Sequence, residues 1–176
     1  MAQHEERIAY YSTLCERLYN PKSSTERDQV QKMLEYSFPT FAGTGGMITQ
    51  QQPPGMENSP TFAIVTPTDT ASALRVLLEH SPSPYVQTFC LSRFKQLIQA
   101  QFTLFSDETK VQLRSFLLEY CFMHTDLEPF VITQLAGVLA LLTRLGWLDV
   151  EEYRNVQKDI HQFLQASLLD NMHVGS

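Results

Sequence analysis

Residues 129–149 read PFVITQLAGVLALLTRLGWLD and include the most apolar segment of the chain. Pro129 predicts the start of a helix, because the missing amide hydrogen of proline costs nothing at the first helical position. From Val131 to Leu142 the sequence is apolar nearly all round a helix. Such a helix needs neighbours on several sides. This stretch therefore predicts the interior of a stacked helical array.

Apolar residues recur at spacings of three and four along most of the remaining chain, which is the pattern of amphipathic helices. Ser23 and Glu26 have the form of a capping box at the start of one of them. Thr68 or Asp69 is expected to cap a later one. The sequence predicts helices at residues 5–19, 24–38, 69–80, 84–101, 107–123, 129–145 and 151–169.

Helices without a convincing strand predict an all-α fold, either a closed bundle or an open stack of helix pairs. Two observations favour the stack. The helices alternate between moderately amphipathic and almost wholly apolar, and turn signals recur at intervals of roughly 40 residues. The chain would then hold about three and a half helical hairpins. The terminal NMHVGS brings no capping helix, so we expect the chain to be part of a longer array.

The segment 39–67, PTFAGTGGMITQQQPPGMENSPTFAIVTP, interrupts the helical pattern. It is rich in Gly, Pro, Thr and Gln and has no helical period, so we predict a flexible insertion. Its TFAIV piece could pair as a strand or dock on a helix. The GTGG word suggests a phosphate-binding loop, but no strand precedes it and no Lys-Ser/Thr follows it. A flexible tip is the preferred interpretation.

Composition argues against several classes of function. The formal net charge is −6 and the isoelectric point is near 5.3, whereas nucleic-acid binding needs clustered Lys and Arg. An acidic balance favours a basic protein partner. No secretory signal is visible, and the longest apolar run, near residues 135–142, is far shorter than the roughly 20 residues of a membrane helix. The sequence predicts a soluble intracellular chain that binds neither nucleic acid nor membrane.

The sequence contains no recognisable set of catalytic or metal-binding residues. Cys15, Cys90 and Cys121 each lie among apolar neighbours at helical spacing, which is typical of reduced core cysteines rather than reactive ones. The five histidines are scattered without the spacing of metal ligands. We therefore expect neither an enzyme nor a bound metal or cofactor.

Several words of the sequence are similar to one known family, in that family's order. They are LCERLYN, TERDQVQKMLEYSFPT, LRVLLEHSPSPYVQTFCLSRFKQLI, ETKVQLRSFLLEYCFM, PFVITQLAGVLALLTRLGWLD and YRNVQKDIHQFLQASL. The chain thereby resembles the N-terminal region of the importin-β, or karyopherin, superfamily of nuclear transport receptors, most closely its exportin-7 group. The most specific word, QLAGVLALLTRLGWLD, is similar to the inner helix of the third repeat. The segment 39–67 departs from the family by being longer and richer in Gly and Gln.

The resemblance implies a superhelix of HEAT repeats, in which the first helix of each pair (A) forms the convex face and the second (B) the concave face. It also implies that the N-terminal concave surface binds the small GTPase Ran in its GTP form. The full-length receptor would carry protein cargo past nuclear pore proteins and shuttle between nucleus and cytoplasm. The alternatives are a HEAT-type scaffold or adaptor without Ran binding, or a truncated, non-functional receptor fragment.

Polar residues of the B helices that lie off the apolar stripe are the candidates for Ran binding. Lys95 and Gln96 carry over from a similar word of the family, and Arg144 matches its basic residue before Leu-Gly-Trp. The full set is Gln31, Glu35, Gln87, Lys95, Gln96, Gln134 and Arg144. For each, the alternative is a solvated helix face or a pair with a neighbouring acid, worth about 0.3–0.5 kcal/mol.

Trp147 is the only tryptophan, and it suggests either a stacking site for a ligand or the end of a helix. Gly146 suits the left-handed residue that ends a helix. Trp147 would then fold back over the last turn and seal one repeat against the next, with Asp149 opening the following helix. This structural role is the preferred interpretation.

Overall fold

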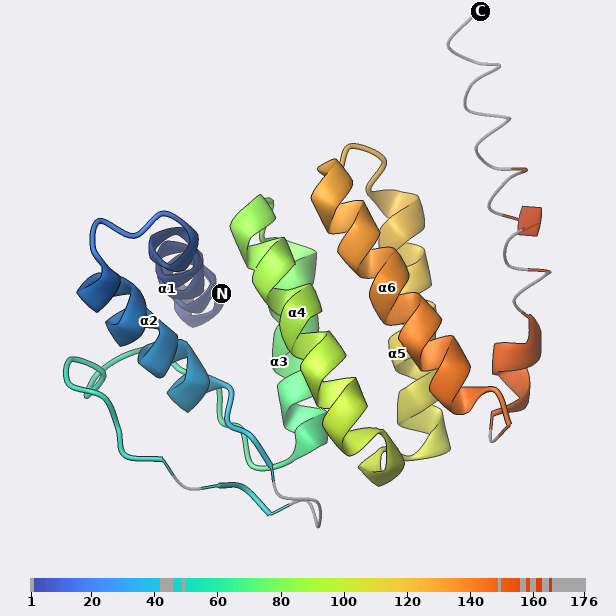
Figure 1. The fold of residues 1–176 in the computed structure, drawn as a ribbon, viewed down its shortest axis with the longest axis horizontal. Coiled ribbons are helices and arrows are strands. Elements are labelled where there is room, and N and C mark those ends of the chain that lie inside the picture. Colours follow the sequence, from blue (N-terminus) through green and yellow to red (C-terminus); the bar gives the residue numbers. More distant parts are fainter. Residues whose placement is uncertain are drawn as a thin grey trace, which may run out of the picture.

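A computed structural model describes residues 2–41, 46–48, 50–148 and 150–155, and positions 158, 161, 162 and 165. Within these residues the only β-type pairing is an isolated bridge between Phe41 and Met47. Two short 3-10 helices, η1 (Phe102–Leu104) and η2 (Glu151–Asn155), follow α4 and α6. The α-helices are α1 (Ala2–Tyr19), α2 (Ser24–Ser37), α3 (Pro67–His80), α4 (Pro84–Gln101), α5 (Asp107–Met123) and α6 (Pro129–Gly146) (Figure 1).

The α-helices form two layers, with α2, α4 and α6 in the nearer layer of Figure 1 and α1, α3 and α5 behind them. Consecutive helices pair as hairpins, α1 with α2, α3 with α4 and α5 with α6. The hairpins follow one another along the longest axis of the molecule. This arrangement confirms the predicted all-α helical repeat solenoid. We call α1, α3 and α5 the A helices, α2, α4 and α6 the B helices, and the three hairpins repeats 1 to 3.

Helix α4 lies at the centre of the core because it packs against α1, α3 and α6. Its side chains Leu91, Phe94 and Ile98 are fully buried. Full burial of side chains of this size contributes about 1.5–3 kcal/mol each. The bounds of α4 and α5 are those predicted from their apolar periodicity and starting residues.

Helix α3 begins earlier than the sequence analysis predicted, and the expectation that Thr68 or Asp69 caps it was wrong. Thr66 is the cap, and Pro67 is the first helical residue. The Thr66 hydroxyl accepts a hydrogen bond from the Asp69 amide at 3.1 Å, and the Asp69 carboxylate accepts one from the Thr66 amide at 2.8 Å. This reciprocal pair satisfies two amides of the helix start, and hydrogen bonds from Thr66 help to lower the pKa of the Asp69 carboxyl.

The start of α2 contains one half of the predicted capping box. The Ser23 hydroxyl accepts from the Glu26 amide at 3.1 Å, as expected. The Glu26 carboxylate instead accepts from the Lys22 amide at 2.7 Å and from the Arg17 guanidinium at 2.8 Å. Glu26 therefore ties the start of α2 back to the end of α1, which closes the turn of repeat 1.

The described part of the segment 39–67 is irregular, and its second half docks on repeat 1. Phe62, in the TFAIV piece, stacks on Tyr11 of α1 at a centroid distance of 5.5 Å. The guanidinium of Arg7 lies 4.7 Å from the centroid of the Phe62 ring, and Met56 is buried. Of the two alternatives for TFAIV, the structure contains the docked one. The flexibility of the insertion stays a prediction.

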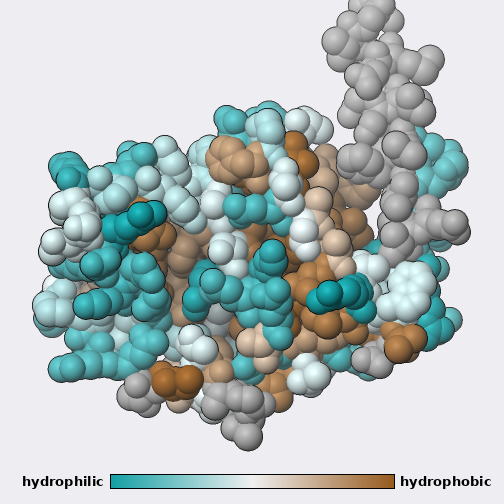
Figure 2. Space-filling model, viewed as in Figure 1, coloured by the Kyte–Doolittle hydropathy of each residue, from teal (hydrophilic) through white to brown (hydrophobic). Residues whose placement is uncertain are grey.

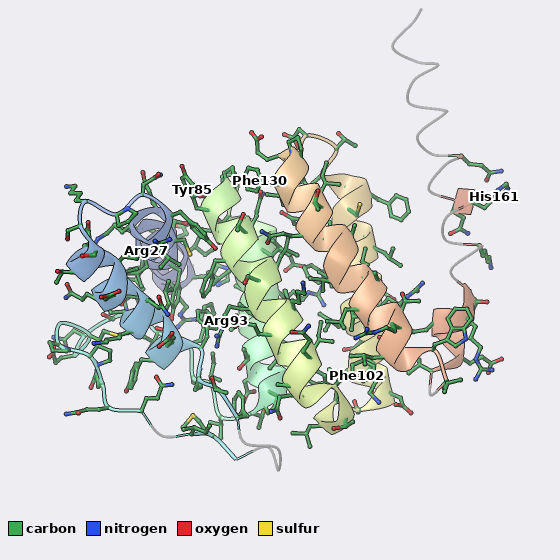
Figure 3. All side chains as sticks on the ribbon, viewed as in Figure 1. Arg27, Tyr85, Arg93, Phe102, Phe130 and His161 are labelled. Carbon is green, nitrogen blue, oxygen red and sulfur yellow. The ribbon has the colours of Figure 1, made fainter. Side chains whose placement is uncertain are left out.

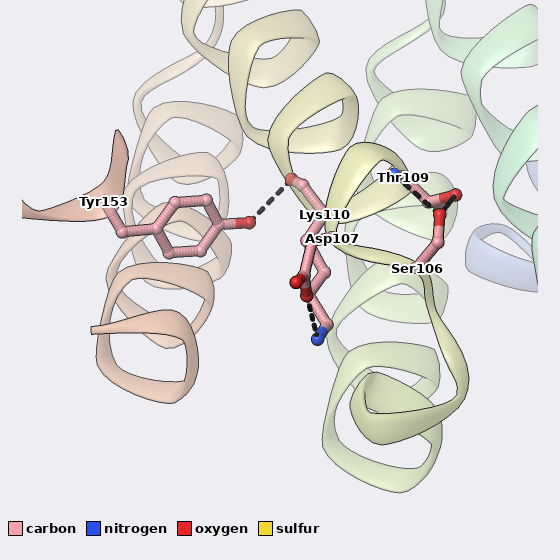
Figure 4. A network of polar contacts seen from close by, with 5 residues as sticks. All are labelled: Ser106, Asp107, Thr109, Lys110 and Tyr153. Atoms are coloured by element: carbon pink, nitrogen blue, oxygen red, sulfur yellow. Dashed lines mark hydrogen bonds and ion pairs between the residues drawn. The ribbon is translucent and has the colours of Figure 1, made fainter. Parts of the chain in front are cut away.

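The end of α6 differs from the expectation for Gly146, which was wrong. The only positive φ among the described residues is at Gly55. Gly146 is instead buried in the helix, where an added Cβ would lie 2.2 Å from the Tyr153 ring. The Tyr153 ring is itself fully buried, and its hydroxyl donates to the Lys110 carbonyl oxygen at 2.6 Å (Figure 4). Glycine is therefore needed here for a close approach of a ring.

The last predicted helix, at residues 151–169, starts as the 3-10 helix η2. Most of its remaining residues, and Asp149 before it, lie outside the described residues. Among the described helices α6 alone is long and apolar enough to span a membrane by length and composition. Of this helix 33% is buried, where α6 packs against α4 and α5, and its other side is apolar and exposed.

Candidate partner-binding face

The outward side of α2, α4 and α6, which we call the B face, is the side of the molecule seen in Figure 2. Its surface is mostly hydrophilic over α2 and hydrophobic over much of α6. The exposed residues of α6 include Ala136, Gly137 and Ala140. The sequence-derived candidates for Ran binding lie on the three helices that form this face.

Most of these candidates are accessible to a partner. Gln31, Lys95, Gln96 and Arg144 are exposed, and Glu35 is half-buried. The Gln31 amide donates to the Glu35 carboxylate at 2.8 Å, one helical turn apart. These residues come from all three B helices, so a partner that contacts them would have to cover all three repeats.

Gln87 corrects the sequence interpretation, because it is not on the accessible surface. It is 5% exposed, and its amide nitrogen donates to the Tyr120 hydroxyl of α5 at 3.2 Å. Gln87 therefore joins repeats 2 and 3 inside the molecule. Gln134 is half-buried, and its side-chain oxygen is buried without a hydrogen-bond partner. The helical period alone placed both residues on the polar side of their helices.

The charges of the B face are divided unevenly between its helices. Helix α2 mixes signs, with Arg27 and Lys32 beside Asp28 and Glu35. Helices α4 and α6 carry Arg93, Lys95 and Arg144 and no acidic residue, although the whole chain has a formal charge of −6. The part of the B face formed by repeats 2 and 3 is therefore basic. Its charge is opposite in sign to the net charge of the whole chain.

Arg93 supports this face from beneath. The guanidinium of Arg93, which is labelled in Figure 3, donates to the Phe38 carbonyl oxygen at the end of α2 and to the Gln96 side-chain oxygen at 2.8 Å. Burial lowers the pKa of Arg93, yet an arginine stays charged at neutral pH. Gln96, a candidate from the sequence, is thus held in one orientation by an arginine that also joins repeats 1 and 2.

The described residues hold no group of three or more His, Cys, Asp or Glu side chains that could bind a metal. Cys15 and Cys90 are buried in the core, and Cys121 is half-buried. Burial raises the pKa of the Cys15 thiol to about 12. A thiol with such a pKa stays protonated at neutral pH and is a poor nucleophile.

Two surface residues at the end of α6 were not among the binding candidates taken from the sequence. Trp147 and Leu148 are both exposed, so the expectation that Trp147 folds back as a seal was wrong. The buried ring that packs over the last turn of α6 belongs to Tyr153. The helical period of residues 151–169 places Tyr153 on the inward side, whereas Trp147 lies in a turn that no period covers.

Comparison with known proteins gives relatives along nearly the whole chain. Ran-binding protein 17 of Mus musculus is 25% identical over 172 residues, which are 96% of this chain. Exportin-7-B of Xenopus laevis is 26% identical over 173 residues, again 96% of this chain. Ran-binding protein 16 of Drosophila melanogaster is 34% identical over 113 residues, 60% of this chain. Along nearly its whole length the chain is similar to proteins named Ran-binding protein 17 and Exportin-7.

These relatives are much longer proteins. The chain spans 13% of the length of Ran-binding protein 17 and of Exportin-7-B, and 10% of Ran-binding protein 16. No protein-family model and no solved structure matches it. The similarity to proteins named as Ran-binding proteins and exportins agrees with the helical repeat fold.

Proposed function

We propose that this chain is a Ran-binding segment of a nuclear export receptor, and that it binds Ran in its GTP form. The observation that carries the proposal is similarity over 96% of the chain to proteins named for Ran binding and for export. Residues 1–176 would form part of a longer HEAT solenoid, with 39–67 as a flexible insertion. Cargo and nuclear pore proteins would bind through the full-length receptor, which would shuttle between nucleus and cytoplasm.

The B face is the surface that we assign to Ran. Its accessible candidates are supplied by α2, α4 and α6, and its repeat 2 and 3 part is basic. Gln87 leaves the candidate set because it is buried. The remaining candidates are Gln31, Glu35, Lys95, Gln96, Gln134 and Arg144.

Selectivity for the GTP form would come from Ran itself. Switch loops of a GTPase are ordered by the γ-phosphate and are released on hydrolysis. A rigid helical face gains most from a partner that is already ordered, because ordering a loop costs free energy on binding. In an export receptor, Ran and cargo would favour each other's binding by an equal factor, so that hydrolysis would release both.

The test is a binding measurement on the 176-residue chain with immobilised Ran, loaded either with a non-hydrolysable GTP analogue or with GDP. We expect retention by the GTP form only. The double variant Lys95→Glu, Arg144→Glu should weaken binding at least about tenfold, or roughly 1.4 kcal/mol. Lys22→Glu is the control for net charge and is compared with the single variants Lys95→Glu and Arg144→Glu, because Lys22 lies in the turn between α1 and α2 and not on a B helix.

Two results would contradict the proposal. Equal retention by both nucleotide forms would show that the chain does not recognise the GTP conformation of the switch loops. No retention would favour the second candidate, a HEAT-type scaffold without Ran binding or a receptor fragment without function. Circular dichroism melting of each variant separates a lost contact from a lost fold.

A further inference from the structure

Two large apolar side chains lie next to each other on the surface at the C-terminal end of α6. Trp147 is 45% exposed and Leu148 is 80% exposed. Scattered exposed apolar residues are ordinary on a folded protein. An exposed pair of Trp and Leu is less common than a single exposed apolar residue, because tryptophan is large and is concentrated in cores and interfaces.

Trp147 is on the surface because Tyr153 occupies the space beside the helix end. The Tyr153 ring lies against Gly146, and its hydroxyl bonds to the Lys110 carbonyl oxygen of α5. The guanidinium of Arg114 lies 5.3 Å from the centroid of the same ring. Because Tyr153 fills this position in the core, Trp147 stays on the surface.

The backbone that carries the pair is held in place by hydrogen bonds. The Arg154 guanidinium donates to the carbonyl oxygens of Trp147 at 3.1 Å and Leu148 at 3.0 Å. The Val150 amide donates to the Gly146 carbonyl oxygen at 2.8 Å. A surface with its backbone fixed in advance loses less entropy on binding than a mobile loop does.

Arg144 completes the group. It is exposed and precedes Trp147 by three residues and Leu148 by four. Trp147 keeps helical backbone angles, φ −55° and ψ −39°. Residues three apart share one face of a helix, so Arg144 and Trp147 lie on the same side of the helix end, and exposed Leu148 follows Trp147 in the turn.

We propose that Arg144, Trp147 and Leu148 form the anchor of the B face, and that they bind a protein surface with an apolar pocket bordered by carboxylates. Tryptophan and arginine are the residues most enriched among those that dominate binding energy at interfaces. Carboxylates complement the anchor because all the charged residues of α4 and α6 are basic. This inference rests on the proposed function, with Ran in its GTP form as the partner.

The main experiment uses Trp147 as the only tryptophan of the chain. The chain is made with 5-fluorotryptophan, which gives a single fluorine NMR signal even when the partner contains tryptophan. Addition of unlabelled Ran bound to a GTP analogue should shift or broaden this signal at saturation, and Ran bound to GDP should leave it unchanged. The free chain should show a signal that responds to a soluble paramagnetic agent, because the side chain is exposed.

Variants give the second measurement. Trp147→Ala and Arg144→Ala should each weaken binding of the GTP form at least about tenfold, the level expected of an anchor residue, and Trp147→Phe should restore part of the loss. Phe130→Ala is the matched control, since Phe130 is 48% exposed at the opposite end of α6. It should change binding less than about twofold. Melting curves should coincide for all four variants.

The outcomes separate the two proposals. If the wild-type chain binds the GTP form, but the fluorine signal does not change and Trp147→Ala binds within about twofold of wild type, the anchor is wrong and the proposed function stands. If the wild-type chain shows no GTP-selective binding, both are wrong. If the paramagnetic agent fails to reach Trp147 in the free chain, another part of the chain covers it and the anchor is again wrong.

Discussion

The junction between repeats 1 and 2 is built differently from the junction between repeats 2 and 3. Helices α4 and α6 pack directly along each other, with α3 and α5 also in contact behind them. Toward repeat 1, α4 packs on α1, and the end of α2 reaches it through aromatic rings. Phe38 lies 5.4 Å from Phe89 of α4 and 6.2 Å from Phe62 of the insertion, between ring centroids.

Hydrogen bonds to the main chain reinforce the first junction. Arg93 and Gln101 of α4 donate to the carbonyl oxygens of Phe38 and Phe41, the latter at 3.0 Å. Between repeats 2 and 3, the Gln87 amide of α4 donates to the Tyr120 hydroxyl of α5, which is a bond between two side chains. The difference teaches that a solenoid can carry an insertion where aromatic rings and main-chain acceptors replace direct packing between B helices.

The first junction is best broken at Phe38. Phe38 is fully buried and its ring also contacts Tyr11 at 5.3 Å. Phe38→Ala should lower the free energy of unfolding by about 3–5 kcal/mol, because the site loses its transfer energy and gains a cavity. Urea denaturation measures it. Phe130→Ala, at an exposed ring, should cost less than about 1 kcal/mol, and an equal cost for both would refute the aromatic junction.

The far end of repeat 3 can be tested with the same substitution at two sites on α6. Gly146→Ala should destabilise by about 1–3 kcal/mol, because its Cβ would overlap the Tyr153 ring. At Gly137 nothing lies within 4 Å of an added Cβ. Gly137→Ala should therefore stabilise by about 0.5–1 kcal/mol through helix propensity alone. Thermal melting measures both effects: the melting temperature should fall for Gly146→Ala and rise for Gly137→Ala. Changes of the same sign in the two variants would contradict the structure.

The polar part of the first junction predicts a smaller effect. Arg93→Met keeps the aliphatic stem but removes the donor to Phe38, and should cost about 1–2 kcal/mol because the carbonyl loses its partner. Arg144→Met is the matched control on an exposed arginine and should stay within about 0.5 kcal/mol of wild type. The urea midpoint should move at constant slope. A loss no greater than that of the control would mean that the aromatic rings alone join repeats 1 and 2.

The capping box at the return of the insertion predicts the smallest effect, and it depends on pH. The pKa of the Asp69 carboxyl lies below its ordinary 3.8 in the folded chain, chiefly through hydrogen bonding to Thr66. Its stabilising contribution is therefore present above pH 3.8 and is lost as the pH falls through the lower folded-state pKa. Asp69→Asn should lose less stability than wild type on acidification.

Melting temperatures of the wild type, Asp69→Asn, Thr66→Val and the double variant, from about pH 7 to about pH 2.5, measure this contribution. Asp69→Asn should lose all of this acid dependence, and Thr66→Val should lose only the part that comes from the Thr66 hydroxyl, because the Val65 and Thr66 amides still donate to Asp69. The double variant should lose no more than Asp69→Asn. Independent, additive losses would show that Thr66 and Asp69 do not act as a pair.

Much of the fold follows from local pattern in the sequence. Three- and four-residue spacing located every described α-helix, because each helix has one face that must be buried. The start of α3 was misplaced although Thr66, Pro67 and Asp69 carry a capping signature, because two later residues are also good caps. The way the repeats join was not predictable, since the contacts of Phe38 depend on a segment without periodicity.

The candidate site was predicted less well, for a related reason. The polar side of a helix follows from its period, and this placed Lys95, Gln96 and Arg144 at accessible positions. The period does not say which polar residue faces a neighbouring helix, so Gln87 was misassigned. Nor does it say whether an aromatic residue just beyond a helix end folds back or stays on the surface, so Trp147 was misplaced.

The carbonyl groups of Phe38 and Phe41 also limit how this chain can be rearranged by design. Consensus solenoids accept exchanged or deleted units because each repeat meets its neighbours through a standard interface. Here a replaced first hairpin would leave the guanidinium of Arg93 and the amide of Gln101 without their acceptors. The first two repeats, with the insertion between them, are a single unit for transplantation, and a chimaera should be cut after residue 101 rather than before α3.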